Sequence, residues 1–81
     1  MKPLVTLYTR IGCHLCDDAK KVVDAARGSA SFDYEEVDID GSEELRRLYN
    51  DEVPVIAING VKAFKYRVEK KELLKKLEAR R

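Results

Sequence analysis

Two cysteines three positions apart stand where a strand-like segment is followed by a helix-like segment. Residues 4–8, Leu-Val-Thr-Leu-Tyr, form a nearly continuous apolar run, which is typical of a strand that is buried on both faces. Over residues 14–27, apolar side chains recur at the spacing of one helix face, and a glycine follows as an end signal. Cys13 and Cys16 therefore lie at the start of the first predicted helix.

The rest of the chain continues the alternation of strand and helix patterns. We expect a strand over residues 32–38, a short helix capped by Ser42 and ended by Asn50, strands over residues 53–58 and 61–66, and a helix over residues 69–79. Leu45, Leu48 and Tyr49 share one face of the short helix. Asn59-Gly60 is a strong hairpin signal, which predicts antiparallel pairing of the last two strands. The expected order is β-α-β-α-β-β-α.

Length and composition indicate one small globular domain over residues 1–81, with 44% hydrophobic and 38% charged residues. The chain shows neither a signal-peptide pattern nor an apolar run near twenty residues, so we expect a cytoplasmic protein without a membrane partner. Residues 65–81 hold eight basic and three acidic residues but no nucleic-acid motif, so we expect no nucleic-acid partner.

The cysteine pair fits exchange chemistry better than a permanent cross-link. Disulfides are rare in the cytoplasm, and closing a loop of about four residues would stabilise the fold by only about 2 kcal/mol. In a helix, Cα atoms three positions apart lie about 5 Å apart, within the ~4.4–6.8 Å range of a disulfide. Cys13 at the helix start favours a thiolate, whereas Cys16, one turn later on the apolar face, favours a neutral thiol. We therefore expect Cys13 to act as nucleophile and Cys16 as resolving thiol.

The segment "LYTRIGCHLCDDAK" resembles the active-site segment of the glutaredoxins, with a basic residue, Gly-Cys-x-x-Cys and Ala-Lys in the family's order. Further on, "VDID" before a helix and "VPVIAING" before a last strand also match, so the resemblance covers nearly the whole chain. It implies an α/β thioredoxin fold, with a mixed four-stranded sheet of order 2-1-3-4 flanked by three helices. The activity it implies is that of a thiol–disulfide oxidoreductase.

The resemblance also implies the residues that receive the substrate. The Val53-Pro54 bond would be cis and lie beside Cys13, so that the Val53 backbone pairs with the substrate chain. Arg10 would steady the Cys13 thiolate or bind a substrate carboxylate, and Tyr66 would lie near the substrate groove. His14 is expected to be an exposed residue without a role.

Two departures from the family pattern bear on the electron donor. His14-Leu15 stand where Pro-Tyr is usual, and Phe64-Lys65-Tyr66 stand where glutaredoxins carry Gly-Gly and a small polar residue that receive glutathione. We therefore consider two donors, glutathione and an NADPH-dependent flavoprotein reductase. The expected protein is a monomer without a tightly bound cofactor, acting on protein or small-molecule disulfides.

Metal binding is the alternative function for the same two thiolates. Copper chaperones also place C-x-x-C after a first strand, and thiolates select Cu(I) or zinc. Those domains end in a strand, however, whereas residues 69–79 read as a helix. His14, Cys13 and Cys16 supply three ligands, so a tetrahedral zinc site or a shared cluster would need a second chain. We expect no metal site within one chain.

Overall fold

The computed structural model describes residues 2–49 and 52–79, and these follow the expected order of strands and helices. The elements are β1 (Leu4–Thr9), α1 (His14–Arg27), β2 (Asp33–Asp38), the 3₁₀ turn η1 (Ile39–Gly41), α2 (Glu43–Tyr49), β3 (Val55–Ile58), β4 (Val61–Lys65) and α3 (Lys70–Ala79). Both predicted ends of the first helix are confirmed. Asn50, which was expected to end α2, lies outside the described residues.

The four strands form one mixed sheet in the order β2-β1-β3-β4, as the resemblance implied. β1 pairs parallel with β2 and antiparallel with β3, and β3 pairs antiparallel with β4. β1 lies inside the sheet, between β2 and β3, and this position explains its continuous apolar pattern. Successive side chains of a strand point to opposite faces, and Val5, Thr6 and Leu7 are all buried.

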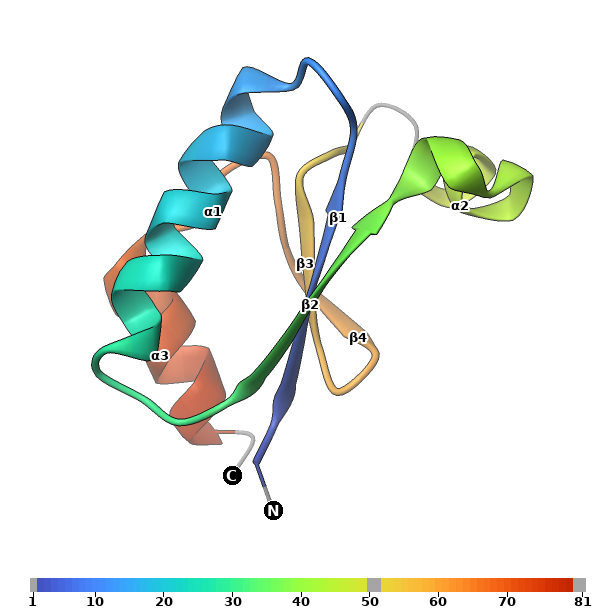
Figure 1. Ribbon diagram of the computed structural model, residues 1–81. Coiled ribbons are helices and arrows are strands. Elements are labelled where there is room, and N and C mark those ends of the chain that lie inside the picture. The colour runs from blue at the N-terminus through green and yellow to red at the C-terminus, as the bar shows by residue number, and fades with distance from the viewer. Residues whose placement is uncertain (1, 50–51, 80–81) are drawn as a thin grey trace.

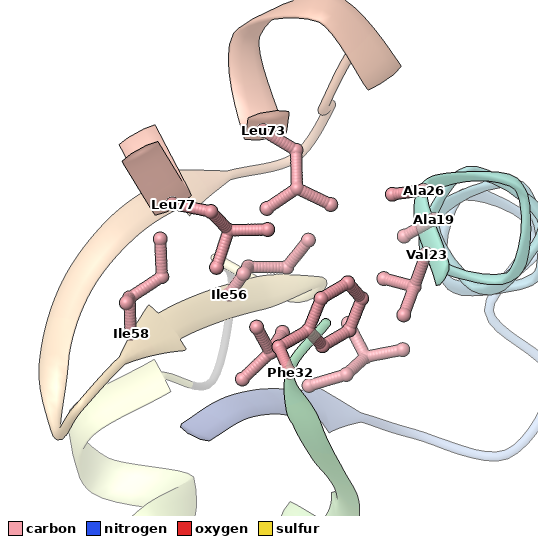
Figure 2. Packing of buried hydrophobic residues seen from close by; sticks show 10 residues of the cluster. Ala19, Val23, Ala26, Phe32, Ile56, Ile58, Leu73 and Leu77 are labelled. Carbon is pink, nitrogen blue, oxygen red and sulfur yellow. The ribbon is translucent and has the colours of Figure 1, made fainter. Parts of the chain in front are cut away.

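The helices cover the two faces of the sheet unequally. Figure 1 shows α1 and α3 side by side on one face, whereas α2 lies on the opposite face. The core forms between the sheet and the α1–α3 layer, where side chains of α1, α3 and the strands meet (Figure 2). Its buried members are Val5, Leu7, Ala19, Val23, Ala26, Phe32, Ile56, Ile58, Leu73 and Leu77. Within residues 2–49 and 52–79, none of the helices has the length and apolar character to span a membrane.

The predicted Asn59-Gly60 hairpin is confirmed, with φ values of 52° and 83° that suit a type I′ turn. Its turn is fastened to the start of β1. The Leu4 N–H donates to Asn59 Oδ1 at 2.9 Å, and the Asn59 N–H donates to the Leu4 carbonyl oxygen at 2.8 Å. β1 starts beside this turn, so its C-terminal end, which leads to the cysteines, lies at the opposite end of the strands.

One boundary of β3 and one of β4 differ from the sequence expectation for physical reasons. β3 begins at Val55 instead of Val53, because Pro54 has no N–H to contribute to a ladder. β4 ends at Lys65, because Tyr66 adopts a left-handed φ of 67°. The apolar face of α2 is only partly covered, since the Leu48 side chain is 56% exposed.

Candidate active site

A four-residue turn carries the chain from β1 to the first cysteine. Gly12 has a φ of 83°, a backbone conformation that residues with a side chain rarely adopt and glycine adopts freely. The Cys13 N–H donates to the Arg10 carbonyl oxygen at 3.4 Å and closes the turn. Cys13 is thereby placed at the N-cap of α1, with φ −89° and ψ 109°.

The Cys13 sulfur occupies the position at which a capping oxygen would normally accept a helix N–H. Its Sγ accepts a hydrogen bond from the Cys16 N–H at 3.2 Å, and the side chain is half-buried. The N–H groups of a first helical turn lack partners within the helix and carry the positive end of its dipole. Of the two cysteines, Cys13 is therefore the one whose sulfur lies at the helix start and is partly exposed.

The Cys16 sulfur belongs to the interior. The residue is 1% exposed, and both cysteines are free thiols in this structure. Burial raises the pKa of the Cys16 thiol, and its hydrogen bond with Cys13 acts in the same direction. Hydrogen bonds with the Thr9 side chain and the Arg10 backbone oppose these effects without reversing the direction of the pKa shift. The two thiols therefore differ in exposure and surroundings, as the helical pattern predicted.

The Val53–Pro54 peptide bond is cis, as the resemblance implied. Tyr8 pairs with Val55 across the antiparallel β1–β3 ladder, so the residues before Val55 and those after Tyr8 lie at the same end of these two strands. Residues 53–54 and the turn that leads to Cys13 are therefore at the same end of the sheet. Among the described residues, the Val53 backbone groups make no backbone hydrogen bond, and the residue is partly buried.

Tyr66 is bound to the cis-proline segment through its backbone. The Tyr66 N–H donates to the Pro54 carbonyl oxygen at 2.8 Å, and the Lys65 Nζ lies 5.6 Å from the centroid of the tyrosine ring. The side chain is 43% exposed. A left-handed φ is strained for a bulky residue, and such strain is found most often at functional sites.

Arg10 lies at the same end of the sheet, and its guanidinium contacts a carboxylate that the sequence reasoning missed. Nη2 lies 3.0 Å from Asp40 Oδ1, and Nε donates to Oδ2 at 3.3 Å. The parallel pairing of Thr9 with Asp38 brings the two loops together, and no local sequence pattern displays this register. His14 is exposed, as expected.

Metal-ligating side chains do not gather in the described part of the chain. Residues 2–49 and 52–79 contain no group of three or more His, Cys, Asp or Glu side chains arranged to hold a metal ion. The last element is a helix, α3, instead of the final strand typical of copper chaperones.

The sheet order and the placement of the helices are those of the thioredoxin fold. A mutant thioredoxin from Halobacterium salinarum NRC-1 matches 96% of this chain and 74% of its own, with a TM-score of 0.73. At 16% sequence identity, this likeness concerns the fold alone.

The chain belongs to the glutaredoxin-like domain family (DUF836), whose model matches residues 4–78. Two solved structures are more similar in sequence. Protein XcR50 from X. campestris is 32% identical, with 93% of this chain and 96% of that chain covered and a TM-score of 0.78. Protein Ne2328 from Nitrosomonas europaea is 30% identical, with 95% and 93% covered and a TM-score of 0.83. Together, the family and the C-x-x-C pair indicate a redox protein.

Proposed function

We propose that this protein is a thiol–disulfide oxidoreductase in which Cys13 attacks a substrate disulfide and Cys16 resolves the product. One observation carries the proposal. The half-buried Cys13 sulfur accepts the Cys16 N–H at 3.2 Å at the start of α1, while the Cys16 thiol is held in the interior one turn away. The attacking sulfur is partly exposed at the helix start, and burial raises the pKa of its partner thiol.

The reaction runs in two balanced exchanges. The Cys13 thiolate attacks one sulfur of R–S–S–R′, forming Cys13–S–S–R and releasing R′S⁻, which takes up a proton from solvent. The Cys16 thiol then gives up its proton and attacks the Cys13 sulfur, forming the Cys13–Cys16 disulfide and releasing RS⁻. The substrate disulfide gains two electrons, and the protein dithiol loses two.

The neighbouring residues orient the substrate in this proposal. The backbone of Val53, beside Pro54, pairs with the substrate main chain and aligns its disulfide with Cys13. Arg10, the first residue of the cysteine turn, attracts an anionic group. Tyr66 lies next to Pro54, to which its backbone is hydrogen-bonded.

The proposed cellular setting follows the same chemistry. The substrates are disulfide-bearing proteins or small molecules in the cytoplasm, and the protein acts as a monomeric single domain without a tightly bound cofactor. The oxidised protein is returned to the dithiol by glutathione or by an NADPH-dependent reductase.

A trapping experiment tests the roles of the two cysteines. Cys16→Ser removes the resolving thiol, so incubation with a peptide disulfide should leave a mixed disulfide on Cys13, seen by intact mass. Cys13→Ser is the matched control. It keeps only the buried Cys16 and should form no adduct within the time that Cys16→Ser needs to form one. An absence of adducts on Cys16→Ser would refute the proposal. Consumption of NADPH with glutathione and its reductase, or with a thioredoxin-type reductase, identifies the donor.

A further inference from the structure

A small pocket lies beside the cysteine turn, between α1 and the segment that joins β4 to α3. Its volume is about 200 Å³, and its lining residues are Leu15, Asp18, Ala19, Tyr66, Arg67, Val68 and Glu69. Leu15 stands between the two cysteines in the sequence, and Tyr66 is bonded to Pro54. Two of the lining residues are therefore close in the chain, or hydrogen-bonded, to residues of the candidate active site.

The size of the pocket restricts its occupant. Pockets that enclose a small-molecule ligand have volumes of about 300–1,000 Å³, so this one encloses only part of a tripeptide such as glutathione. It has room for a single side chain. Its apolar lining comes from Leu15, Ala19 and Val68, with the Tyr66 ring beside them, so that side chain is apolar.

The charges around the pocket also do not favour glutathione. Asp18 and Glu69 contribute two carboxylates and Arg67 one guanidinium. With the Lys65 ammonium 5.6 Å from the Tyr66 ring, a ligand carboxylate at this position meets no excess of positive charge. Beyond the pocket, Ile11 adds apolar surface to the turn that leads to Cys13, where its side chain is 90% exposed.

We infer that this pocket is a specificity subsite for an apolar side chain of a polypeptide, next to the cysteine that Cys13 attacks, and that Tyr66 forms its wall. The inference rests on the proposed function and names its substrate class. The strained Tyr66 backbone is held by the Pro54 hydrogen bond, which keeps the ring at the pocket.

The test uses the reduced protein in single-turnover reactions, which need no electron donor. Two peptide disulfides are compared that differ only in having Leu or Gly beside each cysteine, and oxidised glutathione is the third probe. The wild-type protein should react about tenfold faster with the Leu peptide than with the Gly peptide, the lower end of what one apolar pocket contact contributes. Oxidised glutathione should react more slowly than the Leu peptide.

Variants locate the preference in the pocket. Tyr66→Phe keeps the ring and should retain the preference, whereas Tyr66→Gly, which suits a φ of 67°, should reduce the Leu-to-Gly ratio to about one. Val68→Ser tests the same pocket independently of the Tyr66 backbone and should also lower the ratio. Val61→Ser, at the other end of β4, is the control and should leave it unchanged.

The outcomes separate the two proposals. If the wild-type protein reacts with none of the three disulfides, the proposed function fails. If it reacts with both peptides at equal rates, or faster with oxidised glutathione than with the Leu peptide, the subsite alone is refuted. The subsite is also refuted if Tyr66→Gly and Val68→Ser slow both peptides equally, since the residues would then have a structural role only.

Discussion

The guanidinium of Arg10 contacts the carboxylate of Asp40 through two atom pairs, at 3.0 Å and 3.3 Å. The contact joins the turn that follows β1 to the turn that follows β2. The carboxylate therefore occupies the guanidinium of Arg10, which the sequence analysis suggested as a binding group for a substrate carboxylate. In the proposed function, we therefore expect Asp40 to compete with such a substrate for Arg10.

Asp40→Asn should therefore raise the rate constant for an anionic disulfide. We expect the single-turnover reaction with oxidised glutathione to become a few-fold faster, and Arg10→Gln to make it slower. The change in the free energy of unfolding should stay below about 1 kcal/mol, because exposed ion pairs contribute little. Asp33→Asn, which removes the same charge at the opposite end of β2, is the control. Equal rates in Asp40→Asn and the wild type would contradict the competition.

The burial of Cys16 predicts the pH dependence of its reactivity. Because burial raises the pKa of this thiol, its thiolate should form only above the ordinary pH range of cysteine. The measurement is the thiolate absorbance near 240 nm in Cys13→Ser, in which burial, the largest cause of the shift, remains. Iodoacetamide should accordingly modify Cys13 first in the wild-type protein, as peptide mass spectrometry would show. Preferential modification of Cys16 at neutral pH would contradict the assignment of the two thiols.

Gly12→Ala should destabilise the protein through the backbone alone. A Cβ at Gly12 meets no atom within 4 Å, so the cost comes from the φ of 83° and should be about 1 kcal/mol in urea unfolding. The same change should alter the alkylation rate of Cys13, because the turn positions this sulfur. Gly41→Ala is the matched control. Its Cβ is equally free and its φ is not left-handed, so stability should stay the same or rise slightly.

Glu52 predicts a pH dependence of stability. Its carboxylate lies 2.9 Å from the Lys62 Nζ and 3.4 Å from the Lys65 Nζ, and the hydrogen bond from Lys62 is the main reason that its pKa is lowered. The folded pKa lies below the unfolded one, so the stabilisation is present above the ordinary pKa and is lost as the pH falls through the lowered value.

Glu52→Gln should therefore be less stable than the wild type at neutral pH, and the difference should shrink in acid. Unfolding by urea at several pH values measures this difference, and Asp24→Asn is a control for the loss of one exposed carboxylate. A difference between Glu52→Gln and the wild type that does not change with pH would show that the lysine contacts are not its cause.

Local signals made the first helix and the hairpin predictable. The helix ends at Arg27 because a glycine follows it, and the Asn59-Gly60 turn requires two left-handed residues that this pair readily supplies. The strand order and the cis bond before Pro54 came from the family resemblance, because neither is encoded in a local pattern.

The details of the candidate site depend on contacts between distant segments, which a sequence pattern does not display. Asp40 was missed because it meets Arg10 only after two parallel strands have paired. The pocket was missed because Leu15 and Val68 are brought together by the packing of the α1 and α3 regions. Tyr66 was identified as a candidate, but its left-handed backbone was not foreseen, since nothing near it in the sequence signals a turn.

The burial of Cys16 places two constraints on this one position. At this position, a replacement must preserve both the fit of the interior and the exchange chemistry, so few changes are tolerated. His14 and Leu15, between the cysteines, are outside the buried interior, so the packing of the core does not restrict them in this way. Reactivity in such a scaffold is therefore adjusted most readily by surface substitutions around a fixed internal sulfur.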